Sequence, residues 1–274
     1  MLELPESDVL AQQLEKTLVG KTIREMIVEQ TPHRFAFFSE HKDRYGELLT
    51  GQTVQSARRH GGIAELNTES AMLYFSDGAY PRYFGPNEAK PKKHQLYLGF
   101  EDGSCLAVSV QMYGYIGVFP LGECTHAYYR IAAEKPDPLD SAFTYGYFCG
   151  LRPEQEGKLT LKSFLATQQR IPGLGNGVLQ DILWNAGLDP RKSLRDITED
   201  NFCVLYGALV KTLKEMRRMG GRNTERDLFG NKGGYPCVMS KDTLGSPCPR
   251  CGHAIEKAAY LGGAIYFCPG CQAR

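Results

Sequence analysis

The sequence predicts an α+β protein built in three consecutive parts, and three patterns along its 274 residues support that class. Short segments with alternating apolar residues dominate the first half, as expected for an antiparallel β-sandwich. The apolar spacing then changes to the three-and-four-residue repeat of helices. Two Cys-x-x-Cys pairs near the end have the spacing of a small metal-binding ribbon. We place the three parts at residues 1–133, 134–240 and 241–274.

The first part is predicted to hold a flanking helix and then short antiparallel strands. Apolar residues at helical spacing predict a helix over 7–19, with Gly20 as its end. The stretch "HQLYLGFEDGSCLAVSV" predicts a β-hairpin, because apolar residues alternate over 96–100 and over 106–110 around the tight turn Asp102-Gly103. "IAEL" and "AMLYF" predict further strands, and the acidic, proline-containing "AAEKPDPLD" is interpreted as a linker.

The middle part is predicted to be helical. Helices are expected over 161–169 and over 176–185, the second closed by Gly187. The longest helix starts near Thr198, keeps apolar residues at helical spacing, and ends at Gly220-Gly221. Its polar side carries several Lys and Arg residues.

Charge and hydropathy narrow the class of protein. The net charge of +1 does not by itself indicate a nucleic-acid partner. Residues 1–135 carry 14 Lys and Arg against 17 Asp and Glu, whereas residues 136–274 carry 18 Lys and Arg against 14 Asp and Glu. The basic excess of the second half either indicates that it binds an anionic partner or reflects chance. No apolar run approaches the roughly 20 residues that span a bilayer, and the acidic start lacks a secretory pattern, so we expect an intracellular protein without membrane contact.

Four of the nine cysteines predict a structural zinc site. Cys248 and Cys251 form one pair and Cys268 and Cys271 the other, with sixteen residues between the pairs. At this spacing two tight turns bring four thiolates to one tetrahedral ion, which leaves no open position for catalysis. Redox pairs or disulfides are the weaker interpretation. The remaining five cysteines are scattered along the sequence, and we interpret them as small buried residues.

The stretch "IPGLGNGVLQDIL" places a glycine loop directly before a predicted helix. Gly173, Gly175 and Gly177 surround Asn176, and a helix N-terminus with exposed N–H groups binds phosphate well. A dinucleotide loop is excluded because Val178 occupies its third glycine position and helical sequence precedes the loop. The pattern predicts either a helix–hairpin–helix grip on a nucleic-acid backbone or a plain glycine-rich connection.

Three motifs in this order resemble the formamidopyrimidine-DNA glycosylase and endonuclease VIII family. They are the start "ELPE", the "GLGN" loop between helices, and the four-cysteine ribbon ending in "CPGCQ". "LVGKTI", "LLTGQTV", "KPDPL", "LKSF" and "GSPCPRCG" also resemble family landmarks. The resemblance implies an N-terminal β-sandwich, a helix–two-turn–helix domain that carries a zinc finger, and DNA bound in the cleft between them.

The resemblance also implies base-excision repair by a DNA glycosylase with AP lyase activity. Members flip a damaged nucleotide out of the duplex, an N-terminal proline amine attacks the sugar C1′, and elimination nicks the strand. By match, Glu3 is the acid/base carboxylate and Glu6 supports the helix start and the hydrogen bonds of the site. Lys162, Gly175 and Asn176 would hold DNA phosphates. The expected partner is damaged or abasic double-stranded DNA, bound by a cytoplasmic, nucleoid-associated monomer.

Several positions depart from the family pattern. Leu2 stands where the nucleophilic proline is expected, Gly61 where a hairpin lysine should follow Arg58 and Arg59, and Gly263 where the zinc-finger arginine should fall. "VQMYGYIG" replaces a "DPRRFG"-like stretch. Arg58 and Arg59 remain candidate DNA contacts, while Tyr113 and Trp184 are interpreted as packing residues.

Two functional hypotheses therefore stay open. An α-amine can attack whatever residue bears it, so Met1 or Leu2 could supply the nucleophile. Leu2 is large, so Met1 should be retained, which moves the amine outward by roughly 3.5 Å. The alternative is a catalytically inactive protein that binds damaged DNA through fewer phosphate contacts. A zinc-ribbon protein that contacts other proteins would leave "ELPE" and "GLGN" unexplained.

Overall fold

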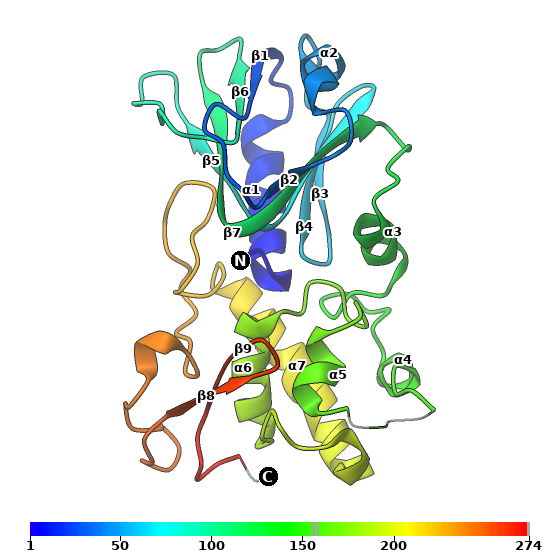
Figure 1. The fold of residues 1–274 in the computed structure, drawn as a ribbon, viewed down its shortest axis with the longest axis vertical. Helices are drawn as coiled ribbons and strands as arrows, with labels where there is room; N and C mark the ends of the chain where they lie inside the picture. Colours follow the sequence, from blue (N-terminus) through cyan, green and yellow to red (C-terminus); the bar gives the residue numbers. More distant parts are fainter. Residues whose placement is uncertain (155–156, 158, 273–274) are drawn as a thin grey trace.

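A computed structural model describes residues 1–154, 157 and 159–272, and it confirms the α+β class (Figure 1). A sheet-rich part holds the first half of the chain, and a helical part with a small hairpin holds the second. In chain order the α-helices and strands are α1 (Leu4–Leu18), β1 (Ile23–Val28), β2 (Ala36–Phe38), α2 (Tyr45–Leu49), β3 (Ser56–His60), β4 (Ile63–Asn67), β5 (Ala71–Phe84), β6 (Leu96–Phe100), β7 (Cys105–Pro120), α3 (Ala127–Glu134), α4 (Tyr145–Gly150), α5 (Leu161–Ala166), α6 (Asn176–Ala186), α7 (Glu199–Arg218), β8 (Glu256–Tyr260) and β9 (Gly263–Phe267).

The N-terminal part is built on an antiparallel sheet with strand order β1-β6-β7-β5-β4-β3, and β2 adds to β7 in parallel. The predicted hairpin over 94–110 is confirmed, because β6 pairs with the first half of β7. The long strands β5 and β7 pair from Ala71 opposite Pro120 to Phe84 opposite Cys105. A bulge between Asp77 and Ala79 interrupts their register. Such a bulge bends and twists the sheet, and here it lies next to the N-terminus of the chain.

Helix α1 packs against this sheet through Leu10, Leu14 and Leu18, which are buried with strand residues in one core. It begins at Leu4, three residues before the predicted start at residue 7, because Pro5 is tolerated in the first helical turn. Gly20, with φ of 85°, follows the helix end as expected.

The second core belongs to the helical part, where α6 and α7 pack side by side around Phe148, Phe164 and Phe202. The predicted ends of α6 at Gly187 and of α7 at Gly220-Gly221 are confirmed, since all three glycines have positive φ. Helix α5 is shorter than predicted and stops at Ala166. Its extension to 169 is wrong because Gln168 and Gln169 adopt positive φ, which no α-helix allows.

The segment 222–228, which follows α7, returns to the sheet part and joins the two halves. The backbone N–H of Tyr83 on β5 donates to the carbonyl of Leu228 at 3.0 Å, and the Leu228 side chain is buried in the sheet core. Gln13 of α1 bonds Asp227 at 3.0 Å and the amide of Leu228 at 2.9 Å. This crossing places the residues before Leu228 against the N-terminus of the chain.

The hairpin β8–β9 packs on α6 through the Gln180 side chain, which donates to the Ala264 carbonyl at 3.1 Å and accepts from the Tyr266 amide at 3.1 Å. Trp184 is buried beside Cys248 and Cys268, so its expected packing role is confirmed. Among the described helices, none is long and apolar enough to cross a membrane.

Candidate nucleic-acid interface

One cleft brings together most of the residues that the sequence singled out. It has a volume of about 740 Å³ and lies where the N-terminus, the glycine loop, the segment after α7 and the β8–β9 hairpin meet. The predicted site residues on its wall are Met1, Leu2, Glu3, Lys162, Gly175 and Asn176. Residues from the two ends of the chain and from its middle therefore share one concave surface, as a binding site requires.

Glu3 lies at the N-terminus of α6. Its two carboxylate oxygens accept hydrogen bonds from the amides of Gly177, at 2.9 Å, and Val178, at 2.7 Å. These are orphan donors of the helix start, which favour a negative charge. A Cβ at Gly175 would come within 2.6 Å of the Glu3 carboxyl carbon. The glycine loop therefore lets the Glu3 carboxylate approach α6, so these two amides hold a side chain rather than a phosphate.

Arg222 is the cation that sequence reasoning missed. Its guanidinium is almost fully buried and bonds Glu6 through Nε at 3.0 Å and through Nη2 at 2.7 Å. Nη1 lies 3.6 Å from Glu3, and Nη2 lies 3.9 Å from Glu225. One positive charge thus faces three carboxylates at the base of the cleft. Only its position just after Gly220-Gly221 marked it in the sequence.

Burial raises the pKa of Glu3 above its ordinary value, and the neighbouring Glu6 adds to this effect. Arg222 and the two α6 amides oppose it without cancelling it. Burial lowers the pKa of Arg222, but Glu3 and Glu6 more than compensate, so its pKa lies well above the usual range. The cluster therefore keeps a permanent cation beside a carboxyl group that can hold a proton more readily than an exposed one.

The N-terminal amine is held on the wall of the cleft by two side chains. Met1 N contacts the Tyr80 hydroxyl and lies 2.8 Å from Oε2 of Glu225. Leu2 is buried, and its amide donates to the Asp77 carbonyl at 2.6 Å. Burial raises the pKa of Glu225, but the positive charges of Arg222 and the amine lower it by more than burial raises it. The net pKa is below the ordinary value, so this carboxyl is ionised at neutral pH. In this chain the nitrogen of Leu2 is a bonded amide, and the amine belongs to Met1.

Lys162 and Asn176 connect the floor of the cleft to the β8–β9 hairpin. The Lys162 ammonium donates to the Tyr260 carbonyl at 2.7 Å, and the Asn176 amide donates to the Ala264 carbonyl at 3.0 Å. Burial lowers the pKa of Lys162. The Asn176 Oδ1 atom is buried and accepts no hydrogen bond from the described residues. Both side chains keep further donor hydrogens that could face a phosphate.

The two glycines at expected cation positions differ in their surroundings. Gly61 has φ of +53°, and a Cβ there would lie 2.8 Å from both Cβ and the carbonyl oxygen of Pro172. Glycine is thus required for the β3–β4 turn to dock on the glycine loop. At Gly263 a Cβ would lie 3.5 Å from the Lys162 ammonium, which is ordinary contact. A side chain is therefore sterically acceptable at 263 and not at 61.

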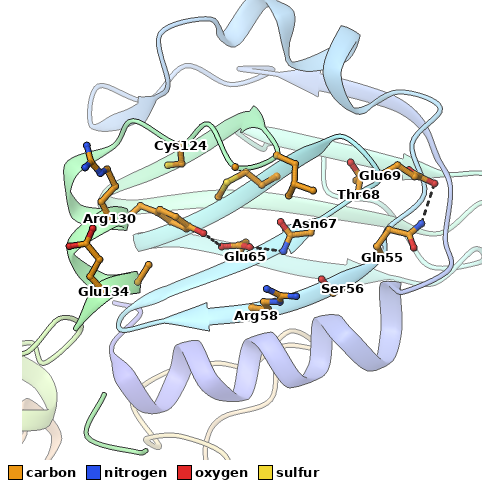
Figure 2. Close-up of a pocket in the computed structure, with 15 residues that line it drawn as sticks. Gln55, Ser56, Arg58, Glu65, Asn67, Thr68, Glu69, Cys124, Arg130 and Glu134 are labelled. Carbon is orange, nitrogen blue, oxygen red and sulfur yellow. Dashed lines mark hydrogen bonds between the residues drawn. The ribbon is translucent and has the colours of Figure 1, made fainter. Parts of the chain in front are cut away.

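Arg58 and Arg59 are not among the residues that line this cleft. The Arg59 guanidinium pairs with Asp8 at 2.6 Å and also with Asp137, and its side chain is 12% exposed. Arg58 instead lines a separate hollow of about 900 Å³ between the β3–β4 hairpin and α3. Figure 2 shows Arg58 below Asn67 in that hollow, with Asn67 bonded to the buried Glu65.

Two residues of the stretch "VQMYGYIG" also reach the cleft. Met112 is 76% exposed and Tyr113 is 40% exposed, and both line the cavity. The interpretation of Tyr113 as a buried packing residue is therefore wrong. Met112 adopts φ of 62° within residues 111–113 of β7, which lie opposite the single residue Gly78 of β5. The strand with the extra residues is the bulged one, and a bulge bends that strand.

The four predicted cysteine ligands converge. The sulfur atoms of Cys248, Cys251, Cys268 and Cys271 all lie within 4.8 Å of one another, and none forms a disulfide. Tetrahedral metal–thiolate bonds of about 2.3 Å separate the sulfur atoms by about 3.8 Å. The Cys248–Cys271 and Cys251–Cys268 separations are 3.7 and 3.3 Å. This set of donors fits one tetrahedral metal ion.

Comparison with known proteins matches both halves of the chain to one family. The model of the formamidopyrimidine-DNA glycosylase N-terminal domain matches residues 1–121, and that of the H2TH domain of the same enzyme matches 135–227. Formamidopyrimidine-DNA glycosylase of Enterococcus faecalis is 28% identical over 99% of this chain and 97% of its own length. The relative of that name from Bacillus licheniformis is 29% identical over 99% of both chains.

Solved structures agree with these sequence matches. The MutM (Fpg) protein of Thermus thermophilus has a TM-score of 0.79 at 25% identity, covering 98% of both chains. Lactococcus lactis Fpg, solved with an abasic site containing DNA, has a TM-score of 0.83 at 23% identity, covering 99% of this chain and 100% of that protein. At 23% identity, the likeness to the Lactococcus lactis structure concerns the fold alone.

Proposed function

Because this chain belongs to the family of formamidopyrimidine-DNA glycosylases and endonuclease VIII, we propose that it is a base-excision repair protein that acts on damaged duplex DNA. Its activity would be that of a DNA glycosylase with AP lyase activity. The observation that carries this proposal is the cleft in which the Met1 amine, Glu3 and the α6 N-terminus meet. A nucleotide turned out of the duplex can reach these groups, whereas a stacked base cannot.

In this proposal DNA lies across the cleft and its phosphates face the hairpin side. The Lactococcus lactis relative was solved with DNA containing an abasic site, and we extend that class of partner to this chain. Lys162 and Asn176 supply donors to the phosphates next to the flipped nucleotide, through the hydrogens not used on the hairpin carbonyls. With glycine at positions 61 and 263, we expect fewer phosphate contacts than in relatives with cations there.

The reaction would use the N-terminal amine as nucleophile and Glu3 as acid and base. As the amine nitrogen attacks C1′, the C1′–N bond forms and the bond from C1′ to the damaged base breaks. The carboxyl of Glu3, whose pKa burial raises, donates a proton on the sugar side and can take one back in the elimination. Glu6 and Arg222 hold Glu3 and the start of α1 in place.

We also propose that the four clustered cysteines hold one Zn²⁺ and that the three-part division of the chain at 1–133, 134–240 and 241–274 describes its domains. Bound zinc would supply the folding free energy that a ribbon of this size cannot gain from apolar burial. The ribbon residues then keep the β8–β9 hairpin against Lys162, Asn176 and α6.

Strand nicking at a single abasic site tests the proposed activity. Wild type should nick such a duplex. Glu3→Gln should nick it at least about 100-fold more slowly, because a general acid–base group raises the rate by about 100-fold or more. The affinity of Glu3→Gln for the duplex should stay within a few fold of wild type. Glu123→Gln, an exposed carboxylate outside the cleft, is the matched control. Tight binding of the abasic duplex without any nicking or covalent adduct would leave the non-catalytic damage binder as the better account.

A further inference from the structure

Two side chains that are far from the N-terminus in sequence hold the Met1 amine. The amine contacts the hydroxyl of Tyr80, on β5, and lies 2.8 Å from Oε2 of Glu225, in the segment that returns from α7. The Tyr80 hydroxyl in turn donates to the same Glu225 oxygen at 2.6 Å. The three groups thus form a closed triangle of hydrogen bonds.

Tyr80 anchors this triangle in the sheet core, and its other two members, Met1 and Glu225, line the cleft. Tyr80 is 7% exposed within the sheet core, and Arg222 lies 3.9 Å from the second oxygen of Glu225. Met1 is 30% exposed and lines the cleft together with Glu3 and Glu225. The Met1 side chain therefore forms part of the cavity wall, and the two groups that hold its amine are largely buried.

The triangle compensates for the residue that replaces proline. Because the Leu2 nitrogen is a bonded amide, the amine lies one residue, or roughly 3.5 Å of chain, further out. An unrestrained terminal residue would be mobile. Attack on a sugar carbon needs the nitrogen within about 3–3.5 Å and correctly oriented, and misplacement by about 1 Å can cost about 100-fold in rate. Tyr80 and Glu225 remove that freedom.

Resting on the proposed function, we propose that Tyr80 and Glu225 are positioning residues that hold the Met1 amine as the group that attacks C1′ of an abasic nucleotide. After the ammonium has lost one proton to solvent, the nitrogen lone pair forms the C1′–N bond with the open-chain aldehyde. The nitrogen then gives up one of its two protons, and the carbonyl oxygen takes up two, one replacing the proton lost by the nitrogen and one from solvent. The C1′–O bond breaks, the oxygen leaves as water, and a positively charged iminium with one N–H remains. The Glu225 carboxylate faces a positive nitrogen before and after the attack, which stabilises the iminium.

Other charged groups also lie near the amine. Asp77 on β5 interacts with it electrostatically, and Arg222 donates to the Met1 carbonyl at 3.4 Å. The same Arg222 guanidinium also pairs with Glu3 and Glu6. Among these groups Glu225 carries the negative charge in direct contact with the amine, so its removal should have the largest effect on the position of the amine.

The test is the rate of borohydride-trapped crosslinking to a duplex with one abasic site, measured at saturating protein. Intact mass first shows whether the purified chain begins with Met1. We expect wild type to crosslink at Met1. Glu225→Gln should lower the rate about tenfold or more, because the amine is then no longer held by the carboxylate.

Two further variants separate positioning from folding. Glu225→Asp keeps a carboxylate and should recover part of the rate that Glu225→Gln loses, whereas Tyr80→Phe should lower the rate because one of the two groups that hold the amine is missing. Glu123→Gln should match wild type. All variants are compared by thermal unfolding and by binding to the same duplex, so that a misfolded variant is identified.

The outcomes distinguish this inference from the function it rests on. If wild type crosslinks but Glu225→Gln keeps the wild-type rate, or if a chain that begins at Leu2 crosslinks equally well, the inference is overturned and the proposed function stands. A crosslink at an internal lysine also overturns it. If wild type binds the duplex and gives no crosslink, the proposed activity fails and the inference fails with it.

Discussion

Replacing Gly263 by arginine should add a phosphate-binding cation to the cleft without disturbing the fold. A Cβ at this position would lie 3.5 Å from the Lys162 ammonium and 4.0 Å from the Asn176 amide, so the side chain has room. Both neighbours are proposed phosphate contacts. Each additional phosphate contact steepens the dependence of log K on log salt concentration by about 0.9. We therefore expect Gly263→Arg to bind an abasic duplex more tightly at low salt, with a slope steeper by about 0.9.

Fluorescence anisotropy titrations over a series of NaCl concentrations measure this slope. Ala259→Arg is the matched control, because Ala259 is exposed on β8 in the same hairpin and does not line the cleft. It adds the same charge to the ribbon and should change the slope much less. Equal slopes for Gly263→Arg and Ala259→Arg would refute the placement of DNA phosphates at Lys162 and Asn176.

At Gly61 the opposite result is expected. A lysine there must adopt φ of +53° and place its Cβ within 2.8 Å of Pro172. The left-handed backbone costs about 1–2 kcal/mol, and the overlap adds about 1–3 kcal/mol. We expect Gly61→Lys to lower the free energy of unfolding by about 2–5 kcal/mol in urea titrations, with no gain in DNA affinity. Wild-type stability for this variant would contradict the docking of the β3–β4 turn on the glycine loop.

Three further predictions follow from buried groups. Cys268→Ser should abolish stoichiometric zinc by atomic absorption and red-shift the fluorescence of Trp184, the chain's single tryptophan, which packs in the ribbon cluster; an unshifted spectrum would contradict metal-dependent folding of the ribbon. Arg222→Met leaves the buried carboxylates without their cation and should lower the free energy of unfolding in urea by about 3–5 kcal/mol. An unchanged free energy of unfolding would show that the carboxylate cluster does not depend on Arg222. Burial raises the pKa of Glu65, but hydrogen bonds from His60, Tyr129 and Asn67 lower it below its ordinary value, so its stabilisation is present at neutral pH and is lost as the pH falls through that lowered pKa. Glu65→Gln should therefore be about 1–3 kcal/mol less stable than wild type near neutral pH and equal to it in strong acid, and a difference independent of pH in thermal unfolding would exclude this explanation.

Local patterns in the sequence predicted much of the fold. The hairpin over 94–110, the end of α6 at Gly187 and the convergence of the four cysteines follow from turn chemistry, helix capping and ligand spacing, which act over few residues. The short form of α5 was missed because its end depends on the positive φ of Gln168 and Gln169, residues without a turn signature.

The parts of the site that the sequence did not predict depend on long-range contacts. Arg222 pairs with Glu6 across 216 positions, and Glu225 meets Met1 across 224, so no local pattern predicts these partners. The sequence showed Gly61 as a missing lysine, whereas the structure gives it a packing role against Pro172. The sequence position of Arg59 predicted a DNA contact, but the structure pairs its guanidinium with Asp8 and Asp137, and it does not line the cleft.

The central claim is that an N-terminal amine other than proline performs the attack on the sugar. The most direct measurement is the site of attachment in the borohydride-trapped complex, determined by mass spectrometry of the digested crosslink between wild-type protein and an abasic duplex. We predict attachment to the α-amine of Met1, next to Tyr80 and Glu225. Attachment to an internal lysine, or no crosslink despite tight binding of the same duplex, would contradict this claim.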